Sequence, residues 1–305
     1  MPNWKTLVDE VNTLKASGSA YDLVRRKYVR QLHEHTGRNV IVYYSGWLQK
    51  PDVIGAGLGD LFSINDNDKN GFMATIHELD RSKGLDLLLH TPGGSIAATE
   101  SLVSYLRSMF GTDIRTIIPQ LAMSAGTMVA CACKEIVMGK QSSLGPIDPQ
   151  IGGMPAHGIL EEFRQARESI LADPSTIPLW QPILAQYDPT LVGDCQKAVD
   201  LSAEMVKEWL VTGMFSGTSD ASVRADIVVE QLSDHALTKT HDRHLSMEKA
   251  VEIGLVVMPL EENQTLQDLV LSVHHACIHA LTETGACKII ENHRGAASIL
   301  VASPN

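Results

Sequence analysis

Leu85-Asp-Leu-Leu-Leu-His90 is a short apolar run that is followed at once by Thr91-Pro-Gly-Gly-Ser95. Near-continuous apolar runs of this kind are typical of strands that are buried on both faces of a sheet. Apolar residues then recur at helical spacing over 96–110, which predicts a helix directly after the glycine turn. The stretch therefore predicts one strand–turn–helix unit of an α/β fold.

Three further runs repeat this pattern along the chain. They are Asn39–Tyr44, Ile114–Ile118 and Glu135–Met138. Strands that alternate with helical stretches predict a mostly parallel sheet with helices on both faces. Helical periodicity also predicts helices in the first 36 residues, over 266–281 and, after an N-cap at Ser246, over 247–253.

Composition excludes several classes of protein. The 305 residues carry 25 Lys and Arg against 36 Asp and Glu, a net charge of −11, which argues against nucleic acid as a partner because such binding needs a basic face. No apolar run approaches the roughly 20 residues that cross a bilayer, and no apolar signal core is visible, so we expect no transmembrane anchor. Five cysteines, an odd number, fit reduced thiols and a cytoplasmic location.

A second motif puts a serine at the predicted start of a helix. Ala122-Met-Ser-Ala-Gly-Thr-Met128 follows the strand that ends at residue 118, and small residues flank Ser124. The free N–H groups and the dipole of a helix N-terminus favour negative charge there. A glycine turn likewise lets a ligand approach the backbone closely. Taken alone, Ser124 also fits an ordinary helix N-cap.

The two motifs together, about thirty residues apart, resemble the ClpP/crotonase superfamily, and Leu245–Val256 resembles a segment of ClpP and of signal-peptide-peptidase-A type proteases. Within that superfamily the chain resembles the serine dehydrogenase proteinase family, a branch of the ClpP-class serine peptidases, over residues 21 to about 260. The stretches that carry this resemblance are Arg25–Tyr28, Thr36–Asn39, Tyr43–Ser45, Gly84–Gly94, Ala122–Met128 and Ser143–Gln150.

The resemblance implies a ClpP/crotonase-like spiral of βα units over residues 37–262, with helical additions at 1–36 and 263–305. It implies a serine peptidase that hydrolyses a peptide or protein substrate through an acyl-enzyme on Ser124. Backbone amides of Gly93 or Gly94 and of Ala125 would hold the oxyanion. It also implies a homo-oligomer, and it requires neither a cofactor nor a metal.

The general base is open at this point. Asp148 stands where ClpP has its histidine, and no lysine occurs where the signal-peptide-peptidase type has its base. We expect His241 to accept the serine proton, with Asp148 or Asp242 orienting it, because this segment corresponds to the region that supplies the third triad member in ClpP.

Other assignments stay open beside this one. Lys140 and His157 are alternative bases, and His90 is expected to be structural or to shape the pocket. A chain without a working base would be a pseudoenzyme or an oligomeric scaffold of the same fold. A crotonase-like enzyme that stabilises acyl-CoA enolates is the remaining alternative.

Two further patterns suggest metal ligands but are incomplete. Asp66-Asn-Asp-Lys-Asn-Gly71 matches the opening of an EF-hand loop, yet its twelfth position is His77 rather than the closing Glu, so we expect a surface loop over 54–71. His275 and His279 have the i, i+4 spacing of zinc ligands but lack an H-E-x-x-H pattern. We expect ordinary helix residues there.

Overall fold

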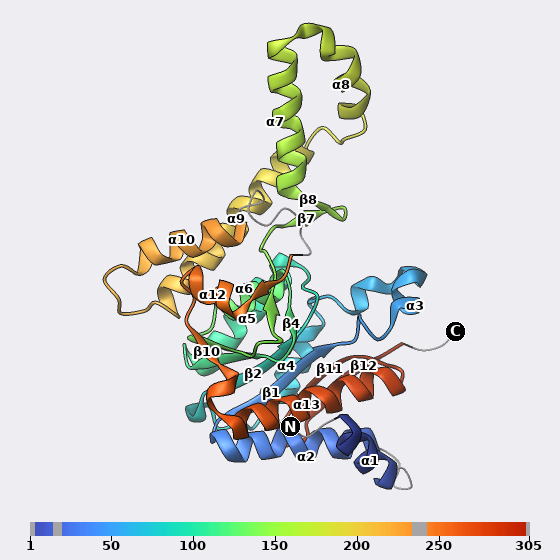
Figure 1. Cartoon of the computed structure of the whole chain (residues 1–305), viewed down its shortest axis with the longest axis vertical. Coiled ribbons are helices and arrows are strands. Elements are labelled where there is room, and N and C mark those ends of the chain that lie inside the picture. Colours follow the sequence, from blue (N-terminus) through green and yellow to red (C-terminus); the bar gives the residue numbers. More distant parts are fainter. Residues whose placement is uncertain (1–3, 15–19, 234–242, 303–305) are drawn as a thin grey trace.

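A computed structural model describes residues 4–14, 20–233 and 243–302 (Figure 1). Its centre is a seven-stranded sheet in the order β10-β5-β3-β2-β1-β11-β12. The strands are β1 (Asn39–Ser45), β2 (Leu85–His90), β3 (Ile114–Ile118), β5 (Glu135–Met138), β10 (Val257–Pro259), β11 (Ala286–Asn292) and β12 (Ala297–Val301). The first five in spatial order run parallel, whereas β11 and β12 are antiparallel additions beside β1. This mixed α/β architecture confirms the predicted fold class.

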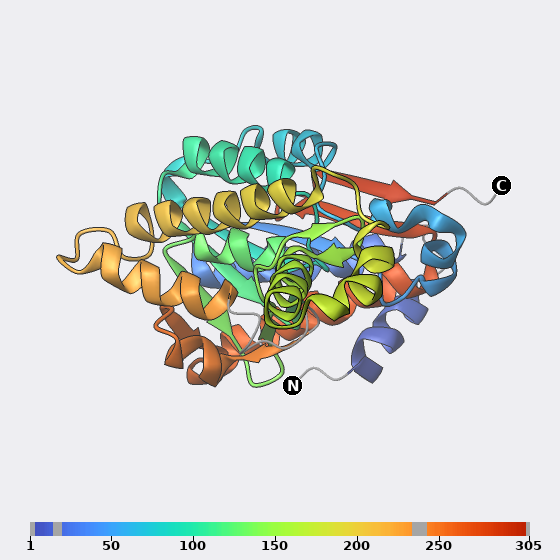
Figure 2. The ribbon, with the colours of Figure 1, turned by 90° about the horizontal axis from the view of Figure 1, so that it is seen from above.

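Helices cover both faces of the sheet because its strands are apolar on both sides. In β1, Ile41 and Tyr43 pack into one core cluster, and Val42 and Tyr44 pack into the other. Figure 2 shows the two helical layers with the sheet between them. The first layer comprises α4 (Asp68–Ile76), α5 (Ile96–Phe110), α6 (Ala125–Cys131), α10 (Ala221–Ser233) and α12 (Met247–Glu252), and the second comprises α1 (Trp4–Leu14), α2 (Ala20–Thr36) and α13 (Gln264–Glu283).

The ends of the chain extend this core. The helix predicted near the C-terminus is α13, and residues 286–301 then form β11 and β12, which the sequence pattern did not predict. The expected surface loop over 54–71 contains more structure than predicted, since α4 begins at Asp68. Short helical turns complete the body: α3 (Pro51–Val53), η2 (Ile54–Leu58), η3 (Gly59–Leu61), η4 (Arg81–Lys83) and η6 (Leu260–Glu262).

A helical arm projects from this body (Figure 1). A small hairpin begins it, and the second half of α9 returns to the core through Val206 and Leu210. Its helix α8 has no buried residue, and Leu179 is 69% exposed. No helix within the described ranges is long and apolar enough to cross a membrane. The arm consists of β7 (Gln150–Ile151), β8 (Met154–Pro155), α7 (Ala156–Ala172), η5 (Pro174–Thr176), α8 (Ile177–Leu184) and α9 (Leu191–Thr212).

A second, three-stranded sheet lies where the arm meets the body. Its order is β4-β6-β9, formed by β4 (Leu121–Ala122), β6 (Ser143–Leu144) and β9 (Leu245–Ser246). In register, Ala122 pairs with Leu144, and Leu144 pairs with Leu245. Because β4 leads directly into α6, this sheet fixes the position of the residues between them.

Candidate active site

Ser124 occupies a sharp turn between β4 and α6. Its backbone has φ 50° and ψ −115°, a left-handed conformation that non-glycine residues seldom adopt and that often marks functional positions. The residue precedes the first turn of α6, but its side chain makes no capping hydrogen bond. Ser95 and Ser246 do cap their helices, so the ordinary N-cap interpretation does not hold for Ser124. The hydroxyl is therefore left available for other chemistry.

The glycine turn after β2 lies against this serine. A Cβ placed on Gly93 would be 2.8 Å from the Ser124 Cβ, closer than real side chains approach, and a tight 3.2 Å from the Ala125 nitrogen. Gly93 also has φ 109°, which L-residues rarely adopt. Only glycine therefore permits this contact between the two motifs that the sequence singled out.

Two backbone amides near Ser124 have no acceptor among the described residues. The N–H of Gly93 donates to Thr91 Oγ1 at 3.1 Å and is already used. The N–H groups of Gly94 and Ala125 donate no hydrogen bond within the described chain. Unsatisfied N–H groups beside a candidate nucleophile are suited to stabilise an oxyanion. Of the two glycines named from the sequence, Gly94 therefore has the amide that is free to do so.

Ser124, Gly93 and Gly94 line a single groove of about 960 Å³. A cavity of this size is large enough for several residues of an extended peptide. Much of its lining is apolar, with Ile96 from α5 and Leu201 from α9 among the contributors. The other residues that line it are Asp60, Ser63, Ile64, Asn65, Pro92, Ser95, Ala97, Met128, Ile147, Pro149, Gln150 and Gly153.

The described lining of this groove contains no histidine and no lysine. Lys140 lies in the turn after β5, where its backbone N–H donates to Glu261. His157 is half-buried near the start of α7 and does not line the groove. His241 and Asp242 lie outside the described residues. The structure therefore brings Ser124 and the two amides together, but not a base from the described chain.

Asp148 is buried beside the groove, between the lining residues Ile147 and Pro149. One carboxylate oxygen accepts a long 3.4 Å hydrogen bond from the His157 backbone N–H. The other oxygen, Oδ2, has no partner among the described residues. A buried carboxylate oxygen without a donor is costly, so Oδ2 is available to accept a hydrogen bond from a further donor.

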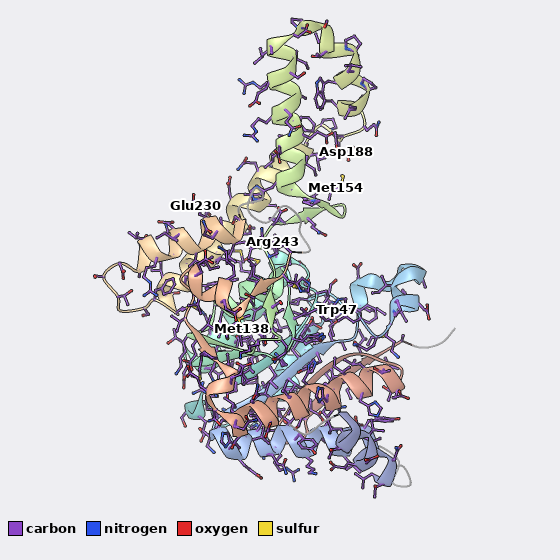
Figure 3. The ribbon with its side chains drawn as sticks, viewed as in Figure 1. Trp47, Met138, Met154, Asp188, Glu230 and Arg243 are labelled. Carbon is purple, nitrogen blue, oxygen red and sulfur yellow. The ribbon has the colours of Figure 1, made fainter. Side chains whose placement is uncertain are left out.

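His90 ends β2 directly before the glycine turn and is fully buried. Its ring lies against Trp47, with centroids 4.4 Å apart, and near Tyr44 and His274. Trp47 is labelled in Figure 3. Burial lowers the pKa of His90 to about 3, and the Leu121 carbonyl offsets this only in part. His90 is therefore a neutral packing residue behind the turn rather than a base in the groove.

This burial predicts a loss of stability in acid. The unfolded chain protonates its histidines near pH 6.5, whereas folded His90 stays neutral to about pH 3. The free energy of unfolding should therefore fall as pH drops through this window, by about 1.4 kcal/mol per pH unit from this residue. In urea titrations, His90→Phe should show a shallower decline between pH 6.5 and 4 than the wild type. The matched variant His77→Gln, at an exposed position, should decline as the wild type does, and equal slopes for all three proteins would contradict the assignment.

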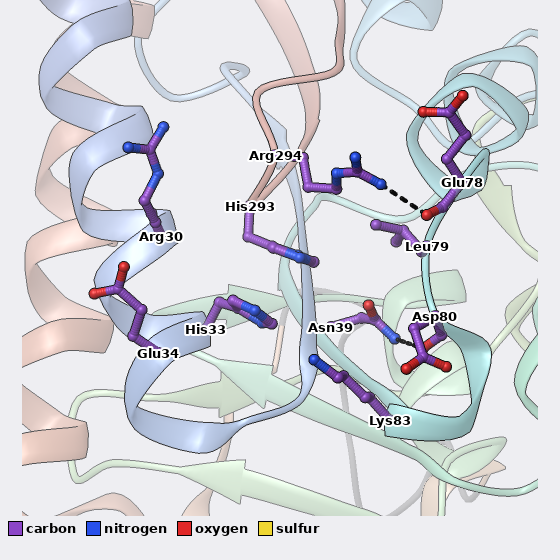
Figure 4. A pocket seen from close by; sticks show the side chains of 10 residues that line it. All are labelled: Arg30, His33, Glu34, Asn39, Glu78, Leu79, Asp80, Lys83, His293 and Arg294. Carbon is purple, nitrogen blue, oxygen red and sulfur yellow. Dashed lines mark hydrogen bonds between the residues drawn. The ribbon is translucent and has the colours of Figure 1, made fainter.

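A second cavity, of about 600 Å³, lies at the other end of the strands, where β1 and β2 begin (Figure 4). The rings of His33 and His293 stack there with centroids 3.7 Å apart. Burial, followed by the neighbouring His33, lowers the pKa of His293 to about 4. No serine, threonine or cysteine lines this cavity. Ser298, on the edge strand β12, lines a smaller pocket of about 190 Å³ whose lining does not include the glycine turn.

Several residues that shape the groove were not recognised from the sequence. Residues 63–65 belong to the segment that was expected to be a surface loop, and Ile64 forms a parallel bridge with Gly94. Thr127 Oγ1 donates to the carbonyls of Ala122 and Gly145 and joins the serine turn to the loop after β6. The sequence feature that could have indicated this contact is a threonine in the first turn of the predicted helix, because its hydroxyl can form a hydrogen bond with backbone groups that precede the helix.

Two uncharacterized proteins of Methanocaldococcus jannaschii are similar to the chain. MJ0137 is 30% identical over 251 residues, which is 81% of this chain and 78% of that protein. MJ1495 is 28% identical over 238 residues, 78% of this chain and 73% of that protein. The solved structure of a mutant of the 1510-N membrane-bound stomatin-specific protease covers 64% of this chain and 75% of its own, with 18% identity and a TM-score of 0.37.

The family assignment rests on a match over most of the chain. A family model described as ClpP-like SDH-type serine proteinase matches residues 15–270. This range contains the glycine turn, Ser124 and the groove around them. The chain therefore belongs to the family of ClpP-like SDH-type serine proteinases.

Proposed function

We propose that the protein is a serine peptidase that hydrolyses peptide bonds through an acyl-enzyme on Ser124. The observation that carries this proposal is the uncapped Ser124 hydroxyl, held in a left-handed turn that lines the same groove as Gly94, together with the free amides of Gly94 and of the next residue, Ala125. Nucleophile and oxyanion donors come from two separate turns that are in van der Waals contact. Family membership supports the peptidase class.

The reaction follows from these groups in two stages. Ser124 Oγ attacks the carbonyl carbon of the scissile bond, and its proton passes to the base. The N–H groups of Gly94 and Ala125 donate to the negative oxygen of the tetrahedral intermediate. The intermediate collapses, the C–N bond breaks and the leaving amine takes the proton. Water then attacks the ester in the same way and releases the acid.

His241 is our proposed base, with Asp148 or Asp242 orienting it. Support comes from both flanks of the segment that contains it. On one side, the Leu232 carbonyl accepts a hydrogen bond from the N–H of Ile147, which lines the groove. On the other side, Leu245 pairs with Leu144 in the sheet that leads to Ser124, and Figure 3 shows Arg243 near the base of the arm. The unpartnered Asp148 Oδ2 fits an imidazole N–H donor.

This base predicts a pH-dependent rate. With His241 as base, kcat/KM for a peptide substrate should rise with pH through the histidine range, near pH 6.5, and then level off. His241→Ala should lower the rate by about 10²- to 10⁴-fold. The measurement is initial rate against pH for the wild type and the variant. A flat profile from mild acid to neutrality would count against histidine and favour a lysine base such as Lys140.

The test of the whole proposal is labelling by a serine-directed fluorophosphonate. The reagent phosphonylates an activated serine hydroxyl, and mass spectrometry of the digested protein locates the adduct. We expect a single adduct on Ser124. An unlabelled but folded protein would instead indicate a pseudoenzyme or scaffold, and a purified protein that carries a CoA adduct would favour the crotonase-like alternative.

We also propose that the protein assembles as a homo-oligomer in the cytoplasm, acting on a peptide or protein substrate. The resemblance to ClpP-class peptidases supports assembly, and the exposed apolar residues Ile177, Leu179 and Ile183 on α8 are compatible with it. The five free and buried cysteines fit a reducing compartment. Light scattering gives the mass of the assembly directly, and a monomer at micromolar concentration would contradict the proposed homo-oligomer.

A further inference from the structure

A short segment, residues 63–65, runs beside the glycine turn and is called the strap below. A Cβ on Gly94 would lie 2.3 Å from both the nitrogen and the oxygen of Ile64, so the strap and the turn touch along their backbones. The Ile64 N–H donates to the Gly93 carbonyl at 2.7 Å, and the Ser95 N–H donates to the Ile64 carbonyl at 2.9 Å. These two bonds flank Gly94 and fix the plane of its peptide.

The side chains of Lys288 and Asp68 form hydrogen bonds with the backbone of the strap. Lys288 Nζ, on β11, donates to the Ser63 carbonyl at 2.7 Å and to Asp68 Oδ1 at 2.8 Å. Asp68 Oδ2 accepts from the Asn65 N–H at 3.1 Å and from the Tyr43 hydroxyl at 2.7 Å. The strap is thus anchored on both sides of Ile64, at residue 63 by the lysine and at residue 65 by the aspartate.

Both charged groups are buried. Lys288 is 2% exposed and Asp68 is 5% exposed. Burial lowers the pKa of Lys288, and Asp68 opposes this shift by its charge and its hydrogen bond. A buried ion pair adds little net stability, because apolar residues of similar size are often as stable in its place. Their hydrogen bonds to the strap give this pair a specific structural task.

We propose that Lys288 and Asp68 are positioning residues for the oxyanion site, acting through the strap on the Gly94 amide. The inference rests on the proposed function and goes beyond it, because it gives the C-terminal strand β11 a part in the reaction. A turn of two glycines has no side chains to fix its direction. Hydrogen bonds to the strap fix the orientation of the turn, and the buried ion pair fixes the position of the strap.

Lysine is the side chain that suits this position of β11. Its ammonium has three donors, which here serve the Ser63 carbonyl and both oxygens of one carboxylate. An uncharged side chain of similar length fills the space but removes the shorter of the two hydrogen bonds to the Ser63 carbonyl, and leaves only the 3.2 Å bond from the Asn65 side-chain amide. The strap is then free to shift by a few tenths of an ångström, which is enough to weaken a preorganised hydrogen bond to an oxyanion.

The experiment compares fluorophosphonate labelling rates and peptide kinetics of the full-length protein and its variants. Lys288→Met leaves Asp68 buried and unpaired, and we expect it to lower both stability and rate. The double variant Lys288→Met with Asp68→Asn removes both charges and keeps an acceptor for the Asn65 N–H. We expect its stability to recover toward the wild type while the labelling rate stays about 10- to 100-fold lower, with the loss in kcat rather than in KM.

Glu291→Gln is the matched control. Glu291 lies three residues further along β11, is buried, and pairs with Arg25 at 2.5 Å. The variant therefore disrupts a buried ion pair of the same strand but leaves the contacts of the strap unchanged. It should lower stability and leave the labelling rate within about twofold of the wild type. Labelling of the double variant at the wild-type rate, or equal slowing in Glu291→Gln, would overturn the inference. A wild-type protein that does not label at all refutes the proposed function instead.

Discussion

Replacing Ser124 with alanine is expected to lower kcat/KM for a peptide substrate by about 10⁴- to 10⁶-fold, because the covalent stage of the reaction disappears. Residual turnover comes from the groove and the two amides acting on a water molecule. The fold should persist, since the Ser124 side chain makes no hydrogen bond within the described chain. The measurement is steady-state hydrolysis of a fluorogenic peptide, with circular dichroism of the same samples to verify the fold.

Ser95→Ala is the control for this prediction. Ser95 lines the same groove, but its hydroxyl accepts a hydrogen bond from the Ala98 N–H and caps α5. Its loss should cost about 1 kcal/mol of unfolding free energy and change the rate by less than tenfold. If Ser124→Ala retained the activity of the wild type, or if Ser95→Ala lost as much, the nucleophile would have to be sought elsewhere.

Gly93→Ala is expected to have the next largest effect. The added methyl group would lie 2.8 Å from the Ser124 Cβ and 2.9 Å from the Met123 carbonyl, both in a rigid turn. The variant should therefore lose about 10²- to 10³-fold in kcat through displaced geometry, and about 2–4 kcal/mol of unfolding free energy through strain and the clash. Hydrolysis rates and denaturant titrations measure the two effects separately.

Gly111→Ala separates the steric effect from the backbone effect. Gly111 ends α5 with φ 62°, and a Cβ there would meet no atom within 4 Å. It should cost only the conformational penalty, about 1 kcal/mol, with an unchanged rate. A Gly93→Ala protein that behaves like Gly111→Ala would show that the glycine turn and the serine turn are less tightly coupled than the contact implies.

The parts of the site that the sequence predicted are local. The strand that ends at His90, the glycine turn and α5 follow one another, so apolar periodicity and glycine spacing were sufficient to predict them. The same holds for Ser124 before α6. Here the sequence left an N-cap possible, and only the backbone angle and the missing capping bond decided against it.

The parts that were missed depend on distant residues. The strap at 63–65 was predicted as a surface loop. Its hydrogen bonds come from Lys288 and Asp68, and the periodicity of a sequence cannot reveal partners that are distant along the chain. Strand β11 was overlooked because Lys288 and Glu291 interrupt its apolar pattern, although both are buried and paired in the fold. A lone lysine among Ala286, Cys287 and Ile289 was the available signal, since lysine is almost never buried without a partner.

The antiparallel pairing of β1 with β11 has a consequence for the order of assembly. Ile41 meets Asn292 in that pairing, so the two strands are separated by about 250 residues of chain. Closing so long a loop is entropically expensive and slow. During synthesis, every residue up to β11 must therefore have left the ribosome before Lys288 can contact the strap. Under the role proposed for Lys288, a nascent chain that has not yet added β11 would have a less ordered oxyanion site and a slower reaction.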